Sequence, residues 1–147
     1  MKQIQKPMHA WGMMLVFLLC LTIYMPSIEA QVYYVPQVEW SPDGELVAVI
    51  LGEQVEIRSV DSQETLYTLE GHTDDIPMVA WSPDGSLLAT PSYDETIKIW
   101  DVNEGTLRFT LAGHEDAVEA VSWTPDSRQL LGWGSDTTRL NLLRWDI

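Results

Sequence analysis

The chain has 147 residues, enough for one domain, and carries 8 Lys and Arg residues against 22 Asp and Glu residues. The net charge of −14 repels phosphate backbones and anionic lipid surfaces, which argues against nucleic acid as a partner. The single cysteine, Cys20, excludes a disulfide framework, so stability must come from packing.

The segment 1–30 differs in composition from the rest of the chain. Two lysines precede the apolar run MMLVFLLCLTIYM, and PSIEA follows it. A basic start, a short apolar run and a small residue before the cut, here Ala30, are typical of a secretory signal peptide. An uncleaved membrane anchor is the alternative, because residues 7–28 lack Asp, Glu, Lys and Arg and about 20 apolar residues can span a bilayer. Both interpretations predict that residues 31–147 are exported (periplasmic, secreted or anchored facing outside), with membrane contact only in the second.

One turn sequence occurs three times, as WSPDG at 40–44, WSPDG at 81–85 and WTPDS at 123–127. Pro presets φ for the first corner position, Asp can bond the local backbone, and Gly tolerates the left-handed conformation that follows. Extended stretches flank each turn, so each copy predicts a β-hairpin. Ser127 replaces Gly in the third copy at a cost of about 1–2 kcal/mol, and we expect this hairpin to be the loosest.

Short β-prone runs separated by turn residues continue along the chain, without a helical period. The third unit has room for three strands rather than four. The strands expected in the first two units are 37–40, 45–50, 54–59, 65–69, 78–81, 86–91, 96–100 and 106–111.

Further landmarks recur at the spacing that separates Trp81 from Trp123. Gly71-His72 and Gly113-His114 open two units, and Trp100-Asp101 closes the second. This combination resembles the WD-repeat (WD40) family. The resemblance implies an all-β protein built from β-propeller blades of four antiparallel strands around a central channel. About 2.75 blades fit into the WD40 repeat region 31–147, at about 35–70, 71–112 and 113–147, so the propeller is expected to be incomplete or completed by oligomerisation.

The resemblance also implies a hydrogen-bonded chain inside the second blade. In the family, the histidine, a strand hydroxyl, a turn Asp and the Trp form this network, and its role is structural. The matching side chains here are His72, Thr90 or Ser92, Asp94 and Trp100. Thr90 and Ser92 lie on the same face of one strand, so the sequence leaves the choice between them open.

The other two units depart from this pattern. The third has His114 and reaches Trp145 three residues late, with 135–136 (Ser-Asp) as uncertain middle members. The first has Arg58 where the Trp belongs and lacks Gly-His. Only the second unit is expected to carry the complete network.

A Ser, a His and an Asp in one repeat raise the question of a hydrolase. A catalytic serine needs an adjacent base and an oxyanion hole that face a pocket, whereas these groups are expected to be consumed by a buried Trp. No GxSxG, HExxH or Gly-rich phosphate loop occurs. We therefore expect no enzyme, no catalytic residue and no cofactor.

The carboxylates that follow the two Gly-His pairs, at 74–75 and 115–116, raise the question of a calcium site. No Asp-x-Asp-x-Asp-Gly loop is present, so solvated loops are expected rather than a metal site.

The leading functional prediction is a non-catalytic scaffold that binds a protein partner through one propeller face. The expected contact residues are Tyr34, Pro36, Asp74, Asp75, Pro77, Glu115, Asp116 and Glu119. One alternative is a fragment of a longer propeller without a function of its own. Another is a periplasmic Tol-type propeller, against which Gly-His and Trp-Asp argue. Because incomplete blades leave open faces and an unpaired edge at 139–146, we also expect self-association or a poorly folded monomer.

Overall fold

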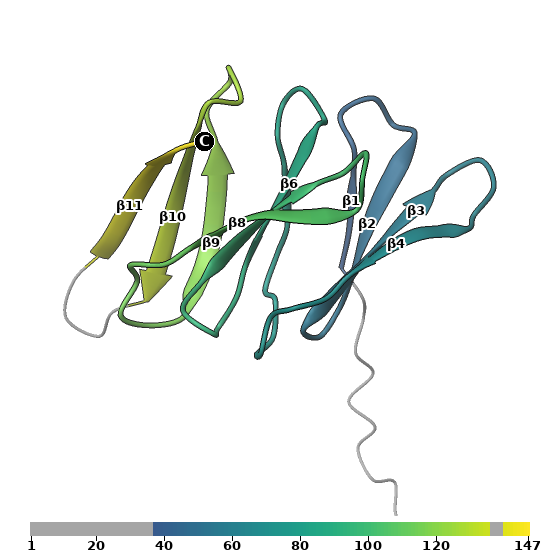
Figure 1. Ribbon diagram of the computed structural model, residues 1–147. Helices are drawn as coiled ribbons and strands as arrows, with labels where there is room; N and C mark the ends of the chain where they lie inside the picture. Colours follow the sequence, from purple (N-terminus) through teal and green to yellow (C-terminus); the bar gives the residue numbers. More distant parts are fainter. Residues whose placement is uncertain (1–36, 136–139) are drawn as a thin grey trace, which may run out of the picture. The chain divides into compact units, whose positions relative to one another are not determined.

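A computed structural model describes residues 37–135 and 140–147, and leaves the side chains of residues 135–141 undescribed. Val35–Ile147 forms one compact unit (Figure 1). The expected signal peptide and two expected contact residues, Tyr34 and Pro36, lie outside the described residues.

Eleven strands form three antiparallel sheets in the described part of the chain, which contains no helix. We call the sheets blades 1, 2 and 3. Blade 1 contains β1 (Val38–Trp40), β2 (Leu46–Leu51), β3 (Gln54–Ser59) and β4 (Thr65–Leu69). Blade 2 contains β5 (Ala80–Trp81), β6 (Leu87–Pro91), β7 (Ile97–Asp101) and β8 (Thr106–Leu111). Blade 3 contains β9 (Val118–Trp123), β10 (Gln129–Ser135) and β11 (Leu140–Asp146). The predicted all-β fold of about 2.75 propeller blades is confirmed.

The repeated pentapeptide forms the same hydrogen-bonded turn in every blade. In blade 2 the Ser82 hydroxyl donates to Asp84 at 2.6 Å and accepts the Leu87 backbone N–H at 2.9 Å. Asp84 in turn accepts the backbone N–H of Ser86. The bond from Ser82, followed by that from Ser86, lowers the pKa of the Asp84 carboxyl. The turn therefore holds itself together through side chains that the sequence repeats three times.

The fifth residue of each turn adopts the left-handed conformation. Its φ is 75° at Gly44, 74° at Gly85 and 59° at Ser127. The expected strain at Ser127 is thus present in the backbone, but the Ser127 hydroxyl also accepts the backbone N–H of Asp84 at 3.2 Å. Because this bond joins the hairpins of blades 2 and 3, the serine compensates part of its own cost.

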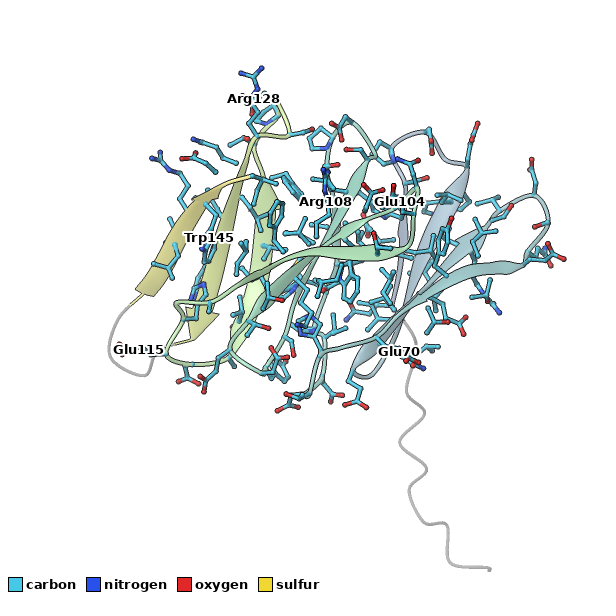
Figure 2. All side chains as sticks on the ribbon, viewed as in Figure 1. Glu70, Glu104, Arg108, Glu115, Arg128 and Trp145 are labelled. Atoms are coloured by element: carbon cyan, nitrogen blue, oxygen red, sulfur yellow. The ribbon has the colours of Figure 1, made fainter. Side chains whose placement is uncertain are left out.

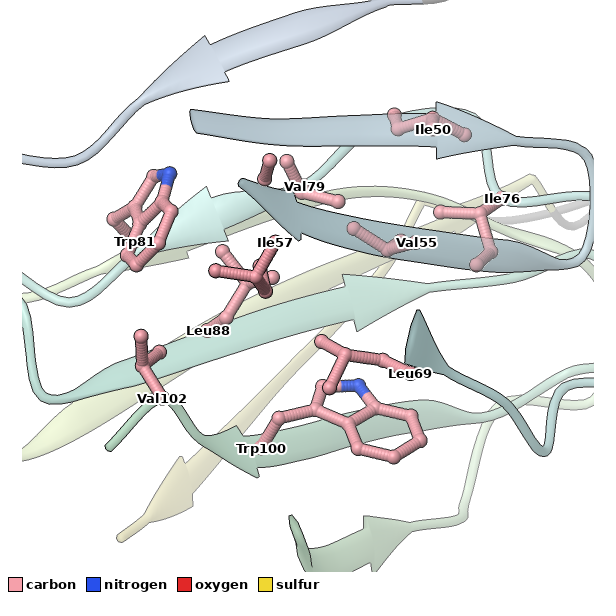
Figure 3. Packing of buried hydrophobic residues seen from close by; sticks show 11 residues of the cluster. Ile50, Val55, Ile57, Leu69, Ile76, Val79, Trp81, Leu88, Trp100 and Val102 are labelled. Carbon is pink, nitrogen blue, oxygen red and sulfur yellow. The ribbon is translucent and has the colours of Figure 1, made fainter. Parts of the chain in front are cut away.

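Apolar side chains fill the two spaces between the blades. Between blades 1 and 2, Val55 and Ile57 of β3 are completely buried beside Leu88 and Trp100 of blade 2 (Figure 3). Between blades 2 and 3, the buried cluster contains Leu87, Ala89, Ile97, Ile99, Val118, Val121 and Leu130. In β7 the two isoleucines face blade 3 and Trp100 faces blade 1, as the alternation of side chains along a strand requires.

The repeated tryptophans connect successive blades. The indole N–H of Trp81 donates to the backbone carbonyl of Glu39 at 3.3 Å, and that of Trp123 donates to the carbonyl of Ala80 at 3.0 Å. Each donor therefore lies one blade after its acceptor, at the edge formed by the first strand of each sheet. The pentapeptide thus closes a hairpin and also fixes the contact between neighbouring blades.

Substitutions at residue 127 should separate the backbone strain from the hydrogen bond. Ser127→Ala keeps the left-handed strain and loses the bond, so we expect the free energy of unfolding to fall by about 1 kcal/mol. Ser127→Gly loses the same bond but relieves the strain. Its free energy of unfolding should therefore be no more than about 0.5 kcal/mol below that of the wild type. Urea unfolding of the three proteins measures both values, and an alanine variant more stable than the glycine variant contradicts this account.

Candidate functional site

A continuous chain of hydrogen bonds runs through blade 2 from Trp100 to Asp94. The Trp100 indole N–H lies 2.9 Å from Thr90 Oγ1, which lies 2.8 Å from His72 Nε2. On the other side of the ring, His72 Nδ1 lies 2.8 Å from Asp94 Oδ2. The four groups come from β6, β7 and the loops beside them. The hydrogen bonds therefore connect the loops at one end of the blade to its middle.

When the imidazole is neutral, one arrangement of protons links all four groups of the network, and the Thr90 backbone carbonyl, 3.0 Å from His72 Nε2, then receives no proton from the ring. The carboxylate of Asp94 can only accept, so the single ring N–H lies on Nδ1 of His72. Nε2 then accepts the hydroxyl proton of Thr90, and the freed lone pairs of Thr90 accept the indole N–H of Trp100. Burial lowers the pKa of His72 more than the neighbouring Asp94 raises it, which keeps the ring neutral near pH 7.

Asp94 anchors the outer end of this chain. Besides the imidazole it accepts the backbone N–H groups of Thr73 and Thr96 and the hydroxyl of Thr96, the last at 2.6 Å. Burial by itself raises the pKa of Asp94, but the hydrogen bonds from Thr96, His72 and Thr73 outweigh it and lower the pKa to about 2. Asp94 is therefore a carboxylate at every physiological pH, and it joins the loop before β5 to the loop before β7.

Thr90, rather than Ser92, carries the hydroxyl of the chain. Ser92 is also completely buried, but its hydroxyl donates to the carbonyl of Asp74 at 2.9 Å and accepts the backbone N–H of Asp94 at 3.1 Å. Ser92 therefore shapes the loop that presents Asp94 and does not touch the imidazole chain. The sequence could not distinguish the two residues because they are two positions apart and were expected on the same face of one strand, whereas β6 ends at Pro91 and Ser92 lies in the loop that follows.

Blade 3 does not form the equivalent chain in its described part. His114 is buried, yet neither ring nitrogen has a hydrogen-bond partner there, and its ring contacts that of Trp145 in a tilted geometry, with centroids 5.6 Å apart and an interplanar angle of 54°. Within the described residues, His114 and Trp145 therefore share a ring contact and no hydrogen bond. The side chains at 135–136, named as uncertain middle members, lie outside the described residues.

The cause is a glycine at the place of the relaying hydroxyl. In the strand pairing, Leu130 opposes Trp145 as Leu88 opposes Trp100, so Gly132 occupies the position of Thr90. A Cβ at Gly132 would lie 2.6 Å from Ile97 Cδ1 and 2.9 Å from the ring of Trp145, so these side chains fill the space of a hydroxyl. The sequence contains a signal for this difference. Gly132 follows Thr90 at the same spacing that separates Trp81 from Trp123, so the repeat alignment places a glycine where blade 2 has the threonine.

Blade 1 replaces the network by an exposed ion pair. Arg58 occupies the position of Trp100, because it pairs with Val47 as Trp100 pairs with Leu88. Its guanidinium lies 3.1 Å from the carboxylate of Glu56 and donates to the Thr65 hydroxyl at 3.0 Å. Such an exposed pair contributes about 0–1 kcal/mol, so blade 1 depends on its packing against blade 2.

The described members of the expected contact set lie at one end of the blades, the end with the longer loops, which we call the loop end. Figure 2 labels Glu70 and Glu115 at this end and Arg128 at the opposite end. Asp74, Asp75, Glu115 and Asp116 are exposed, and Pro77 is half-buried. Glu119 is exposed as well, but it lies within β9 rather than in a loop. Among the described residues, the loops at this end, 52–53, 70–79, 92–96 and 112–117, contain eight carboxylates and neither Lys nor Arg; the segment 136–139, which lies outside the described residues, contains one Asp and one Arg.

Two of these loops repeat the same local geometry. Asp74 accepts the backbone N–H of Asp75 at 2.8 Å, and Asp116, one repeat later, accepts that of Ala117 at 2.9 Å. The carboxylates are therefore held at equivalent places on neighbouring blades and point a regular negative charge outward.

A groove at the first strands of the blades was not predicted from the sequence. A groove of about 420 Å³ follows the first strands of all three blades and is lined by Trp40, Trp81, Trp123, Met78 and Glu39 among others. No group of three or more His, Cys, Asp and Glu side chains in the described residues has the arrangement of a metal site. Within the same residues, no helix is long and apolar enough to cross a membrane.

The family model for the WD domain, G-beta repeat, matches this chain twice, at residues 63–101 and 105–138. A search of curated proteins gave no match. The two matched segments contain β7 with Trp100 and the paired loops of blades 2 and 3, and they support assignment of the chain to the WD40 family.

Two histidine substitutions should show which imidazole stabilises the protein. His72→Leu leaves the hydroxyl proton of Thr90 without its ring acceptor and removes one of the two hydrogen bonds to Asp94 Oδ2, so the free energy of unfolding at pH 7 should fall by about 2 kcal/mol or more. His114→Leu removes a buried ring without a described partner, so it should cost less than about 1 kcal/mol.

The pH dependence of stability provides the second readout for these variants. Burial lowers the pKa of both histidines below the ordinary 6.5, so the unfolded chain binds more protons and wild-type stability should fall as the pH drops below about 6.5. His114→Leu should weaken this decline between pH 7 and pH 5. Urea unfolding at both pH values measures it, and equal costs for the two substitutions would show the network assignment to be wrong.

Proposed function

Because its repeats support assignment to the WD40 family, we propose that this chain is a non-catalytic, exported interaction module that binds a protein partner through its loop end. WD40 domains generally mediate protein–protein interactions, and the two repeat matches carry this part of the proposal. The fold by itself does not define a partner, so the choice of surface depends on the side chains.

The loop end is favoured by its repeated, exposed carboxylates. Asp74 and Asp116 are held in the same geometry one blade apart, and Glu115 and Glu119 are exposed beside the second of them. A rigid scaffold that carries charged loops suits recognition, because the loops need little ordering when they bind. With no Lys or Arg in these loops, the chemistry that fits best is a basic protein surface.

The burial of the imidazole chain supports a non-catalytic role. The side chain of His72 is 1% exposed, and both its nitrogens are engaged by Asp94 and Thr90. A general base must reach the proton that it removes from a substrate. The Ser, His and Asp residues of blade 2 are thus better suited to holding the blade than to hydrolysis.

Export is supported by the basic start and the apolar run of residues 1–30. It is part of the proposal because it defines where the partner must be found. A reporter fused after residue 147 that is active only outside the cytoplasm tests it, and a silent reporter contradicts it.

Charge reversal at the loop end tests the proposed binding surface. Glu115→Lys with Glu119→Lys changes two exposed carboxylates whose side chains make no hydrogen bond within the described residues. The matched control, Asp61→Lys with Glu64→Lys, makes the same charge change in the β3–β4 turn at the opposite end. The measurement is the amount of partner protein that is cross-linked to each variant in the native host. We expect the Glu115→Lys, Glu119→Lys protein to recover at least about tenfold less partner than the wild type, and the Asp61→Lys, Glu64→Lys protein to recover as much as the wild type.

Rising salt should weaken binding of the wild type, because exposed charges are screened beyond about 8 Å at physiological ionic strength. Equal recovery with both charge-reversed proteins would contradict the loop end as the binding surface.

A further inference from the structure

One contact between blades occurs twice in this chain with the same atoms in the same register. Trp81 donates its indole N–H to the carbonyl of Glu39, and Trp123 donates its indole N–H to the carbonyl of Ala80. The acceptors pair with Ala48 and Ala89, which are equivalent positions of β2 and β6. The contact is therefore a repeating unit that advances one blade at a time.

The next donor and the next acceptor of this series are both present at the surface. Trp40, the tryptophan of the first turn, is 59% exposed, and its indole N–H has no hydrogen-bond partner in the described residues. Ser122 pairs with Leu131 as Ala80 pairs with Ala89, so its carbonyl occupies the next acceptor position, and the residue is exposed.

The faces that carry these two ends are apolar. On blade 1, Val38 is 51% exposed beside Trp40, at the position that Val79 holds between blades 1 and 2. On blade 3, Trp133 and Leu142 are 47% and 63% exposed. They pair with each other at the positions of Ile50 and Val55 in blade 1, both of which blade 2 buries.

We infer that blade 1 of one copy docks on blade 3 of a second copy of this chain, with the Trp40 indole N–H donating to the Ser122 carbonyl. The interface is head to tail, because it joins two different surfaces of the same molecule, and it can repeat from copy to copy. A second copy is the occupant that the structure favours, since it presents the geometry already seen twice inside the chain.

Two arginines distinguish this interface from the internal ones. Arg58 lies at the position of Trp100, and Arg144 opposes Leu131 as Ile57 opposes Ala48. Arg58 keeps Glu56 as a partner at 3.1 Å. The docked contact is therefore more polar than the space between blades 1 and 2, and the assembly should be reversible, with a mean mass that rises with protein concentration.

This assembly uses the open faces of the blades and not the loop end, so it holds or fails independently of the proposed partner binding. The full chain of 16.7 kDa is used throughout, and its mass is measured by light scattering over a hundredfold range of concentration. We expect Trp40→Arg to weaken association of the wild type at least about tenfold, as truncation of an interface tryptophan typically does. Trp40→Phe, which keeps an aromatic ring of smaller size and loses the donor, should associate more strongly than Trp40→Arg and more weakly than the wild type.

Leu66→Arg is the matched control. Leu66 of β4 is 45% exposed, and the equivalent bulged position of blade 2 already holds Arg108. This variant introduces the same charge on an outer strand, and it should associate like the wild type. Far-ultraviolet circular dichroism establishes that each variant keeps its strands.

Mixing two defective variants tests the head-to-tail arrangement directly. The Trp40→Arg variant retains an intact blade 3 face, and a Leu142→Arg variant retains an intact blade 1 face. Each should be monomeric alone, whereas an equimolar mixture should form a dimer, because one sound interface is restored. A monomeric wild type at every concentration, equal effects of Trp40→Arg and Leu66→Arg, or a mixture that stays monomeric would each overturn the inference.

Discussion

The hydroxyl of Thr90 is the group on which the polar interior of blade 2 depends. It is the only partner of the buried Trp100 indole N–H in the described residues, and it gives its own proton to His72. Without it, a buried donor and a buried acceptor would lose their partners together, at about 1–3 kcal/mol each. Through His72 the constraint reaches Asp94, and from there the backbone of the loops before β5 and β7. The middle blade can thus support the blades packed on both its faces.

The neighbouring blades show what happens when this group is lost. Blade 3 has Gly132 at the same place, and its histidine is left in a tilted ring contact with Trp145 and without a described hydrogen bond. Blade 1 has an exposed arginine in place of the tryptophan. Both are held by apolar side chains and by the tryptophan contacts at the first strands, so the chain combines one blade with a satisfied polar interior and two that depend on it.

Much of this architecture could be predicted from the sequence, because a repeated turn fixes where each hairpin begins. All eight strands expected in blades 1 and 2 are found, with ends shifted by at most two residues. The alternation of β7 was also predictable, since side chains of a strand point to opposite faces. The choice of Thr90 over Ser92 was not, because it depends on which hydroxyl the loop of Asp94 reaches. The missing hydroxyl beside His114 was predictable as well, because one repeat beyond Thr90 leads to Gly132. The bond from Asp84 to Ser127 joins residues 43 positions apart, beyond any local pattern.

Hydrogen exchange at single amides tests most directly whether the network of blade 2 stabilises this structure. The backbone N–H groups of Thr73 and Thr96 donate to Asp94, whereas Glu115, the counterpart of Thr73 in blade 3, has no such bond among the described residues. We expect the amides of Thr73 and Thr96 to exchange more than about tenfold more slowly than that of Glu115, after correction for intrinsic rates. Equal protection of the three amides would contradict it.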